Sequence, residues 1–122
     1  MTKPRVLIVE DEVEIATGLQ WLLEAEGMTA LIVSLANEVL PAVDDFKPDV
    51  MLLDLSLPDA DGRTVYESVK GRLPVIFSTG SIADLQLTES GLAHVEVLMK
   101  PYTGEDLLRT IDRVLSPGTK NE

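Results

Sequence analysis

The sequence contains no cysteine among its 122 residues, so disulfide bonds and thiolate metal sites are excluded. Basic residues are scarce and scattered: ten Lys and Arg face 21 Asp and Glu, for a net charge of −11. A nucleic-acid surface needs clustered basic residues, so this class of partner is not expected. No stretch approaches the ~20 apolar residues of a membrane span, and no secretion signal is present. We therefore expect a cytoplasmic protein that binds neither nucleic acid nor membrane.

What is present is typical of an ordinary soluble domain, with 45% hydrophobic and 25% charged residues. The length predicts one domain over residues 1–122, with a core of about 4–116 and a tail over 117–122. A chain of this size buries roughly two thirds of its unfolded surface, so it needs no covalent crosslink.

Three short apolar runs each end in polar residues. Val50–Leu53 is followed by Asp54, Val6–Val9 by Glu10 and Asp11, and Val75–Phe77 by Ser78 and Thr79. Uninterrupted apolar runs of this length are typical of strands buried on both faces of a parallel sheet. Ligands of such sheets gather at the carboxyl ends of the strands, where these polar residues stand.

Strands and helices are predicted to alternate along the chain. The expected strands are 5–9, 29–33, 50–54, one starting at Pro74, and 94–99; the expected helices are 12–26, 37–46, one through Val65 and Val69 ending at Gly71, a weakly patterned 82–90, and one running to Leu115 behind a capping box at 103–106. In the first helix the predicted apolar stripe is Ile15, Leu19, Leu22 and Leu23, and Gly27 is its expected C-terminal glycine. This alternation predicts an α/β fold with a parallel sheet and right-handed crossovers.

If the first and third strands are neighbours, the carboxylates of Glu10, Asp11 and Asp54 converge. At close range each pair of like charges repels by about 4 kcal/mol at an effective dielectric near 20. Either one carboxyl group is protonated or a divalent cation lies between them. Oxygen ligands of this kind suit Mg²⁺, and the backbone carbonyl of Ser56 is a further candidate ligand.

A carboxylate facing such a cation can attack phosphorus and form an acyl phosphate, and we assign this role to Asp54. Lys100, after the fifth strand, offers a positive charge for the phosphoryl oxygens, and Thr79 offers a hydroxyl. Each residue alone has an ordinary alternative: Asp11 as a helix N-cap, Asp54 as a turn residue, Lys100 as a solvated lysine, Thr79 as a strand-end hydroxyl. Their joint placement at strand ends favours the site.

This constellation resembles the receiver domain of two-component response regulators over residues 4–116. Glu10-Asp11 matches the acidic pair, Asp54 the phospho-accepting aspartate, Thr79 the switch hydroxyl and Lys100-Pro101 the lysine–proline pair; Leu57-Pro58 and Asp61-Gly62 match the loop after the aspartate. The resemblance implies a flavodoxin-like (βα)5 three-layer sandwich with strand order 2-1-3-4-5. It implies a phosphoryl donor that is a histidine kinase or a histidine phosphotransfer protein, and output through a downstream protein or a phosphorylation-dependent dimer.

Two departures bear on switching. Val97 stands where many receivers carry an aromatic residue, and Gly80 follows Thr79 where alanine is common. With Phe77 they resemble the FAT GUY subgroup of receivers, and they suggest that backbone rearrangement after Thr79 replaces the aromatic rotation. A pseudo-receiver that binds partners without phosphorylation is one alternative. A haloacid-dehalogenase-type phosphatase is another, but it needs an acid where Ser56 stands, so we expect no enzyme.

Candidate partner-surface residues are Ile15, Trp21, Pro101 and Tyr102. By helical projection Trp21 falls on the outer side of the first helix, where it suits a partner anchor. The alternative, packing of its ring over Gly18 and Ala25, is slightly favoured. The single histidine, His94, is interpreted as a surface or edge residue.

Overall fold

The computed structural model describes residues 3–80 and 96–116, and these residues form a five-stranded parallel sheet flanked by helices. The strands are β1 (Arg5–Val9), β2 (Thr29–Val33), β3 (Val50–Asp54), β4 (Val75–Thr79) and β5 (Glu96–Met99). Their order across the sheet is β2-β1-β3-β4-β5, which confirms the predicted topology. Strands β1, β3 and β4 lie at the centre, and these are the strands whose ends carry the predicted acidic and hydroxyl residues.

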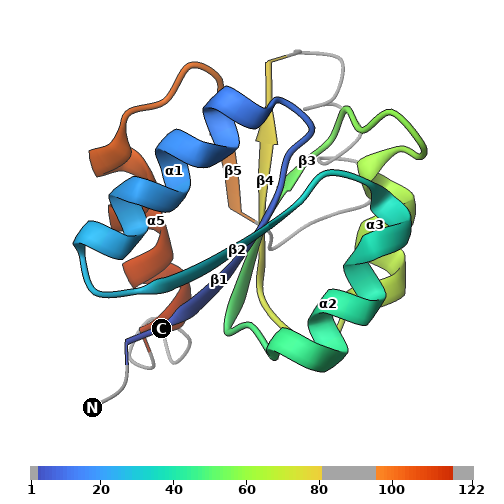
Figure 1. Cartoon of the computed structure of the whole chain (residues 1–122), viewed down its shortest axis with the longest axis horizontal. Coiled ribbons are helices and arrows are strands. Elements are labelled where there is room, and N and C mark those ends of the chain that lie inside the picture. The colour runs from blue at the N-terminus through green and yellow to red at the C-terminus, as the bar shows by residue number, and fades with distance from the viewer. Residues whose placement is uncertain (1–2, 81–95, 117–122) are drawn as a thin grey trace.

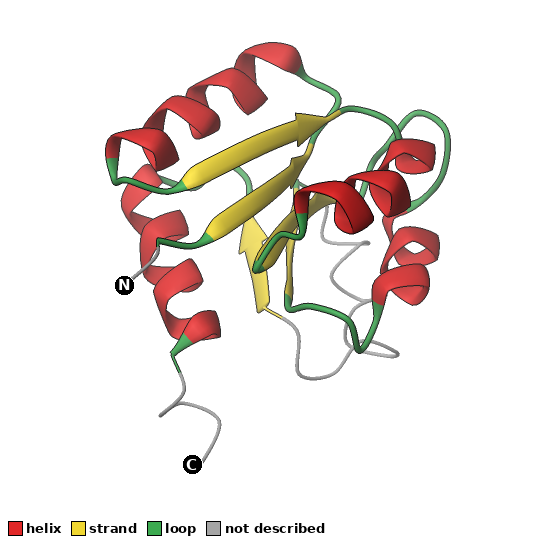
Figure 2. Ribbon diagram, turned by 60° about the horizontal axis from the view of Figure 1, so that its bottom comes forward, coloured by secondary structure: helices red, strands yellow, loops and turns green. Residues whose placement is uncertain are grey.

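Helices cover both faces of the sheet (Figures 1 and 2). The described helices are α1 (Val13–Ala25), α2 (Val39–Phe46), α3 (Gly62–Val69) and α5 (Gly104–Leu115), and a 3₁₀ turn (Ala36–Glu38) leads into α2. Helices α1 and α5 lie on one face, and α2 and α3 on the other, which makes three layers (Figure 1). The weakly patterned 82–90 segment and His94 lie outside the described residues.

The two faces of the sheet contribute to separate apolar clusters, because successive side chains of a strand point to opposite faces. The cluster under α2 and α3 contains Leu7, Met51, Leu53 and Phe77, among others; the cluster under α1 and α5 contains Val6, Ile8, Leu52 and Ile76, among others. All residues of β3 and β4 are buried. This explains why their sequences are continuous apolar runs rather than alternating patterns.

Several helix ends follow the local chemistry that the sequence predicts. Thr103 and Asp106 form the predicted capping box of α5, with hydrogen bonds of 3.0 Å in each direction. Gly27 adopts a φ of 87° after α1, a left-handed conformation that favours glycine. Helix α2 starts two residues later than expected, after the 3₁₀ turn, and Pro41 lies in its first turn, where no helical N–H bond is lost.

The predicted apolar stripe of α1 needs one correction. Ala16 and Leu23 are the buried residues of this helix, whereas Ile15 is 39% exposed. The other three residues of the stripe face the core as predicted: Leu23 is buried, and Leu19 and Leu22 pack against the cluster under α1 and α5. Ile15 therefore lies at the margin of the core, where a partner can contact it.

No helix among the described residues is both long enough and apolar enough to cross a membrane.

Candidate functional site

Three carboxylates meet at the carboxyl edge of the sheet. Glu10 and Asp11 follow β1, and Asp54 ends β3; the register pairs Val9 with Leu53, so Glu10 and Asp54 leave adjacent strands side by side. One oxygen from each of the three carboxylates lies within 4.8 Å of the others. Glu10 and Asp54 are buried, while Asp11 is exposed. Asp11 is not the N-cap of α1, because Glu12 occupies that position.

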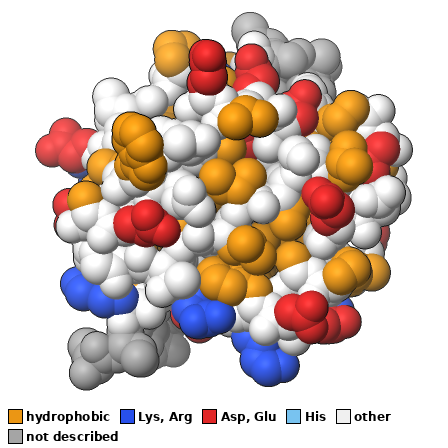
Figure 3. Space-filling view, in the orientation of Figure 1, with side chains coloured by type: hydrophobic (Ala, Val, Ile, Leu, Met, Phe, Trp, Pro, Cys, Tyr) orange, Lys and Arg blue, Asp and Glu red, His pale blue; other side chains and the backbone are white. Residues whose placement is uncertain are grey.

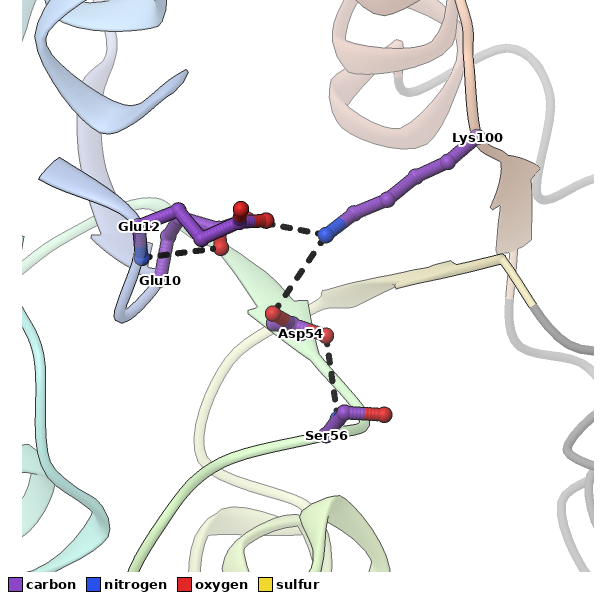
Figure 4. A network of polar contacts seen from close by, with 5 residues as sticks. All are labelled: Glu10, Glu12, Asp54, Ser56 and Lys100. Carbon is purple, nitrogen blue, oxygen red and sulfur yellow. Dashed lines mark hydrogen bonds and ion pairs between the residues drawn. The ribbon is translucent and has the colours of Figure 1, made fainter. Parts of the chain in front are cut away.

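Lys100 brings a positive charge to two of these carboxylates from β5, on the other side of β4. Its Nζ lies 3.2 Å from Glu10 Oε1 and 3.4 Å from Asp54 Oδ2 (Figure 4). Burial by itself lowers the pKa of Lys100, but the charges of Asp54 and Glu10 outweigh it and raise the pKa above its usual range. The ammonium group is therefore fixed in its charged form beside the acids.

Glu10 is the carboxyl group of the cluster whose pKa is raised. Burial and the neighbouring charge of Asp54 raise the pKa of Glu10 to about 7, although the backbone N–H of Glu12 and the charge of Lys100 act in the opposite direction. The Glu12 N–H donates to Glu10 Oε2 at 3.2 Å (Figure 4). Burial and the charge of Asp54 thus outweigh the charge of Lys100 in setting the pKa of Glu10.

The loop after β3 orients the carboxylate of Asp54. The backbone N–H of Ser56 donates to Asp54 Oδ1 at 2.9 Å, and Ser56 pairs with Asp61 in an antiparallel bridge. A Cβ built on Gly62 would lie 2.8 Å from the Cα of Leu55, so only glycine allows α3 to start this close to the strand. The loop is therefore held against the end of β3, and Ser56 remains exposed beside the acids.

Thr79 ends β4, one residue beyond Ser78, which pairs in register with Asp54. The Thr79 side chain is buried, and its carbonyl accepts a hydrogen bond of 2.7 Å from the backbone N–H of Lys100. The last residue of β4 and the lysine are thus joined directly through the backbone. Val97 is partly buried against the cluster under α2 and α3.

The candidate partner-surface residues differ in exposure. Trp21 is 69% exposed, and apart from the chain neighbours of Gly18 no described side chain lies within 4 Å of a Cβ built on Gly18, so the predicted packing of the Trp21 ring over Gly18 is wrong. Pro101 is exposed, whereas Tyr102 is half-buried. Tyr102 packs against the cluster under α1 and α5 instead of standing free on the surface.

Two features of the site region were not predicted from the sequence. Asp59 accepts backbone N–H bonds from Ala36 at 2.7 Å and Asn37 at 3.1 Å, which ties the loop after β3 to the turn before α2. The hydroxyl groups of Ser78 and Tyr102 are buried close to the acids. For the buried hydroxyl pair, the only sequence signal was that Ser78 directly follows the apolar run Val75–Phe77.

The acidic cluster is chemically suited to a metal ion. Its donors are carboxylate oxygens from Glu10, Asp11 and Asp54, a set that favours hard cations such as Mg²⁺ over soft metals. The raised pKa of Glu10 is consistent with this, since a divalent cation would offset the burial and the Asp54 charge that disfavour its ionised form.

Comparisons with known proteins agree with one another. A family model described as response regulator receiver domain matches residues 6–112. The chain is 33% identical over 120 residues to the sensory transduction protein RegX3 of Mycolicibacterium smegmatis, covering 96% of this chain and 53% of that protein. It is 30% identical over 115 residues to the transcriptional regulatory protein BaeR of Escherichia coli, covering 92% of this chain and 48% of BaeR. The chain spans about half the length of these two curated relatives.

Solved structures show the same likeness. A CheY-like response regulator receiver domain from Methanospirillum hungatei superposes with a TM-score of 0.85 at 29% identity, covering 99% of this chain and 100% of that one. The receiver domain of a modulated diguanylate cyclase from Desulfovibrio desulfuricans gives a TM-score of 0.84 at 29% identity, covering 98% and 99% of the two chains.

Proposed function

The chain belongs to the response regulator receiver domain family of two-component signalling, and we propose that Asp54 is its phospho-accepting residue. The donor in this proposal is a phosphohistidine of a histidine kinase or a histidine phosphotransfer protein. Asp54 attacks phosphorus with one carboxylate oxygen; the new P–O bond forms as the P–N bond to the donor imidazole breaks. The proposal includes a single receiver domain over residues 1–122, which the family match over 6–112 supports. It also includes a cytoplasmic location.

One observation carries the proposal: Asp54 is a buried strand-end carboxylate held by donors on both of its oxygens. Ser56 N–H holds Oδ1 at 2.9 Å, and Lys100 Nζ lies 3.4 Å from Oδ2. A carboxylate kept in one orientation loses little entropy when it attacks, which lowers the barrier for transfer.

Glu10, Asp11, Asp54 and the Ser56 carbonyl are the residues that would hold Mg²⁺. When bound, this ion supplies positive charge that offsets the acids and the phosphoryl oxygens. The protein groups do the rest in our proposal. Lys100 moves its ammonium group from the carboxylates onto a phosphoryl oxygen, and the Thr79 hydroxyl donates to another, so the negative charge of the group is matched by fixed donors.

Partner binding is proposed to use α1 and the segment after β5. Ile15 and Trp21 expose apolar surface on α1, and Pro101 is exposed directly after Lys100. Acidic side chains are distributed over the face that carries α1, while basic side chains lie along its lower edge (Figure 3). This pattern favours a donor protein with apolar contacts and a basic rim. The output is proposed to be contact with a downstream protein or a phosphorylation-dependent dimer.

Intact-mass measurement tests the acceptor. We expect incubation with Mg²⁺ and acetyl phosphate, a small acyl-phosphate donor, to add one phosphoryl group to the protein. Asp54→Asn should abolish the addition, because an amide cannot attack, while Asp45→Asn on the exposed side of α2 should leave it unchanged. Omission of Mg²⁺ should slow the addition strongly.

The same experiment separates the alternatives. A protein that never gains mass would be a pseudo-receiver that binds partners without phosphorylation. Labelling that survives Asp54→Asn would place the acceptor elsewhere and refute the proposal. Turnover of a generic phosphomonoester would indicate a phosphatase, which we do not expect because Ser56 stands where that chemistry needs an acid and the nucleophile ends β3 rather than β1.

A further inference from the structure

Two buried hydroxyl groups lie beside the acidic cluster without a hydrogen bond of good geometry to any described residue: Ser78 Oγ and Tyr102 OH. Ser78 is 1% exposed. Buried polar groups in native proteins are nearly always hydrogen-bonded, because an unmade bond costs free energy. No well-formed hydrogen bond among the described residues accounts for the two hydroxyls in the resting fold, so they call for an explanation in another state of the protein.

The pair lies near the strand end that carries the proposed acceptor. Ser78 is the register partner of Asp54 across β3 and β4, and it shares the α1/α5 face of the sheet with Ile76 by the two-residue alternation of the strand. Tyr102 packs against the apolar cluster on this same face. Burial raises the pKa of Tyr102, a loose hydrogen bond with the Ser78 hydroxyl opposes that rise, and the charges of Glu10, Lys100 and Asp54 all act on the phenol. The two hydroxyls therefore face each other within range of the site.

Lys100 connects this pair mechanically to the acceptor. Its Nζ is shared between Glu10 and Asp54 at 3.2 and 3.4 Å, which is longer than the 2.7–2.9 Å of the strongest charge-assisted bonds. Its backbone N–H donates to the Thr79 carbonyl at 2.7 Å. Added negative charge on Asp54 would draw the ammonium group closer, and the backbone two residues further on carries Tyr102. A small shift there is enough to change the distance between two hydroxyls already in contact.

We propose that Ser78 and Tyr102 are positioning residues whose mutual hydrogen bond reaches good geometry when Asp54 is phosphorylated, with the phenol donating to Ser78 Oγ. The inference rests on the proposed function. A bond that is stronger in one state shifts the equilibrium toward that state by the difference between its net free energies in the two states. Val97 lies against the opposite apolar cluster and has no polar group to contribute. Tyr102 is thus the aromatic residue that responds to the acceptor in this chain.

The inference is tested by the binding of beryllofluoride, which imitates a phosphoryl group on a carboxylate, in the presence of Mg²⁺. Its affinity is measured by titration calorimetry at saturating Mg²⁺ for the wild type, Ser78→Ala, Tyr102→Phe and the double variant. We expect each single variant to bind about 2- to 10-fold more weakly, the range of one neutral hydrogen bond. The double variant should bind no more weakly than either single variant, because both remove the same bond. Tyr66→Phe is the matched control: this second tyrosine packs on Phe77 under the other face, with ring centroids 5.4 Å apart.

Thermal unfolding of the free proteins separates this role from a merely structural one. We expect nearly unchanged or higher midpoints for Ser78→Ala and Tyr102→Phe, since the resting state loses no hydrogen bond of good geometry. The inference is overturned if the beryllofluoride affinities of the variants match that of the wild type, or if the losses of the single variants add in the double variant. It is also overturned if each substitution lowers the unfolding midpoint of the free protein as much as it lowers that of the beryllofluoride-bound protein. A wild type that does not bind beryllofluoride would overturn the proposed function as well, whereas binding that all variants share would overturn this inference alone.

Discussion

The pKa of Glu10 makes a quantitative prediction about metal binding. A carboxylate must lose its proton before it can ligate a cation, so Mg²⁺ competes with the proton that Glu10 holds with a pKa of about 7. One competing proton with this pKa weakens binding about 10-fold at pH 6 relative to pH 8. Around pH 7 each bound ion should release roughly half a proton.

Titration calorimetry at pH 6, 7 and 8 measures both quantities, since buffers with different ionisation enthalpies report the released protons. Glu10→Gln should weaken Mg²⁺ binding and remove most of its pH dependence over this range. Glu12→Gln is the matched control: it removes a neighbouring negative charge but keeps the backbone N–H that contacts Glu10 and keeps the titrating carboxyl group. An affinity that is flat from pH 6 to 8, or binding without proton release, would refute the assignment of Glu10 as a strained ligand.

The same carboxyl group links pH to stability. Its folded pKa of about 7 lies above its ordinary value of 4.5, so the folded state binds the proton more tightly than the unfolded state. The stability that this proton contributes is fully present below pH 4.5 and is lost as the pH rises through 7, and it amounts to roughly 3 kcal/mol. Urea denaturation without metal should show this loss, and Glu10→Gln should abolish it. Saturating Mg²⁺ at pH 8 should restore stability.

Further predictions concern the loop between β3 and α3. Asp61→Ala removes the N-cap that accepts the first N–H groups of α3 and should destabilise the protein by about 1 kcal/mol in urea denaturation. Gly62→Ala places a methyl group 2.8 Å from the Leu55 Cα and should cost roughly 1–3 kcal/mol; a neutral effect would show that the helix start yields easily. Asp59→Ala frees the loop from the turn before α2 and should weaken Mg²⁺ binding measured by calorimetry, with little change in phosphorylated mass at saturating Mg²⁺.

Much of the fold was predictable because the signals are local. The apolar runs of β3 and β4 end at the residues where the strands end, and the capping box at Thr103 starts α5. The placement of Glu10 beside Asp54 follows from the same logic, since strand ends of a parallel sheet share one edge. The roles of these residues remain predictions, although the structure brings them together as the sequence indicated.

Contacts between distant segments were not predictable from local patterns. The helical projection of α1 placed Ile15 with the core, but the way the helix lies on the sheet leaves Ile15 partly exposed and buries Ala16. Asp59 resembles any turn acid in the sequence, and only the folded chain brings it to the N–H groups of Ala36 and Asn37. Tyr102 was expected at the surface, and packing turned it inward.

The amino-acid sequence by itself determined the alternation of strands and helices, the sheet order implied by family resemblance, and which side chains stand at the strand ends. These depend on neighbours within a few residues or on the fixed geometry of a parallel sheet. Only the tertiary structure decided that Lys100 divides its charge between Glu10 and Asp54, and that two buried hydroxyls near the acceptor make no hydrogen bond of good geometry within the described part of the chain. Such contacts depend on how side chains from different strands pack in one buried space, and no local sequence pattern encodes the distances between their polar atoms.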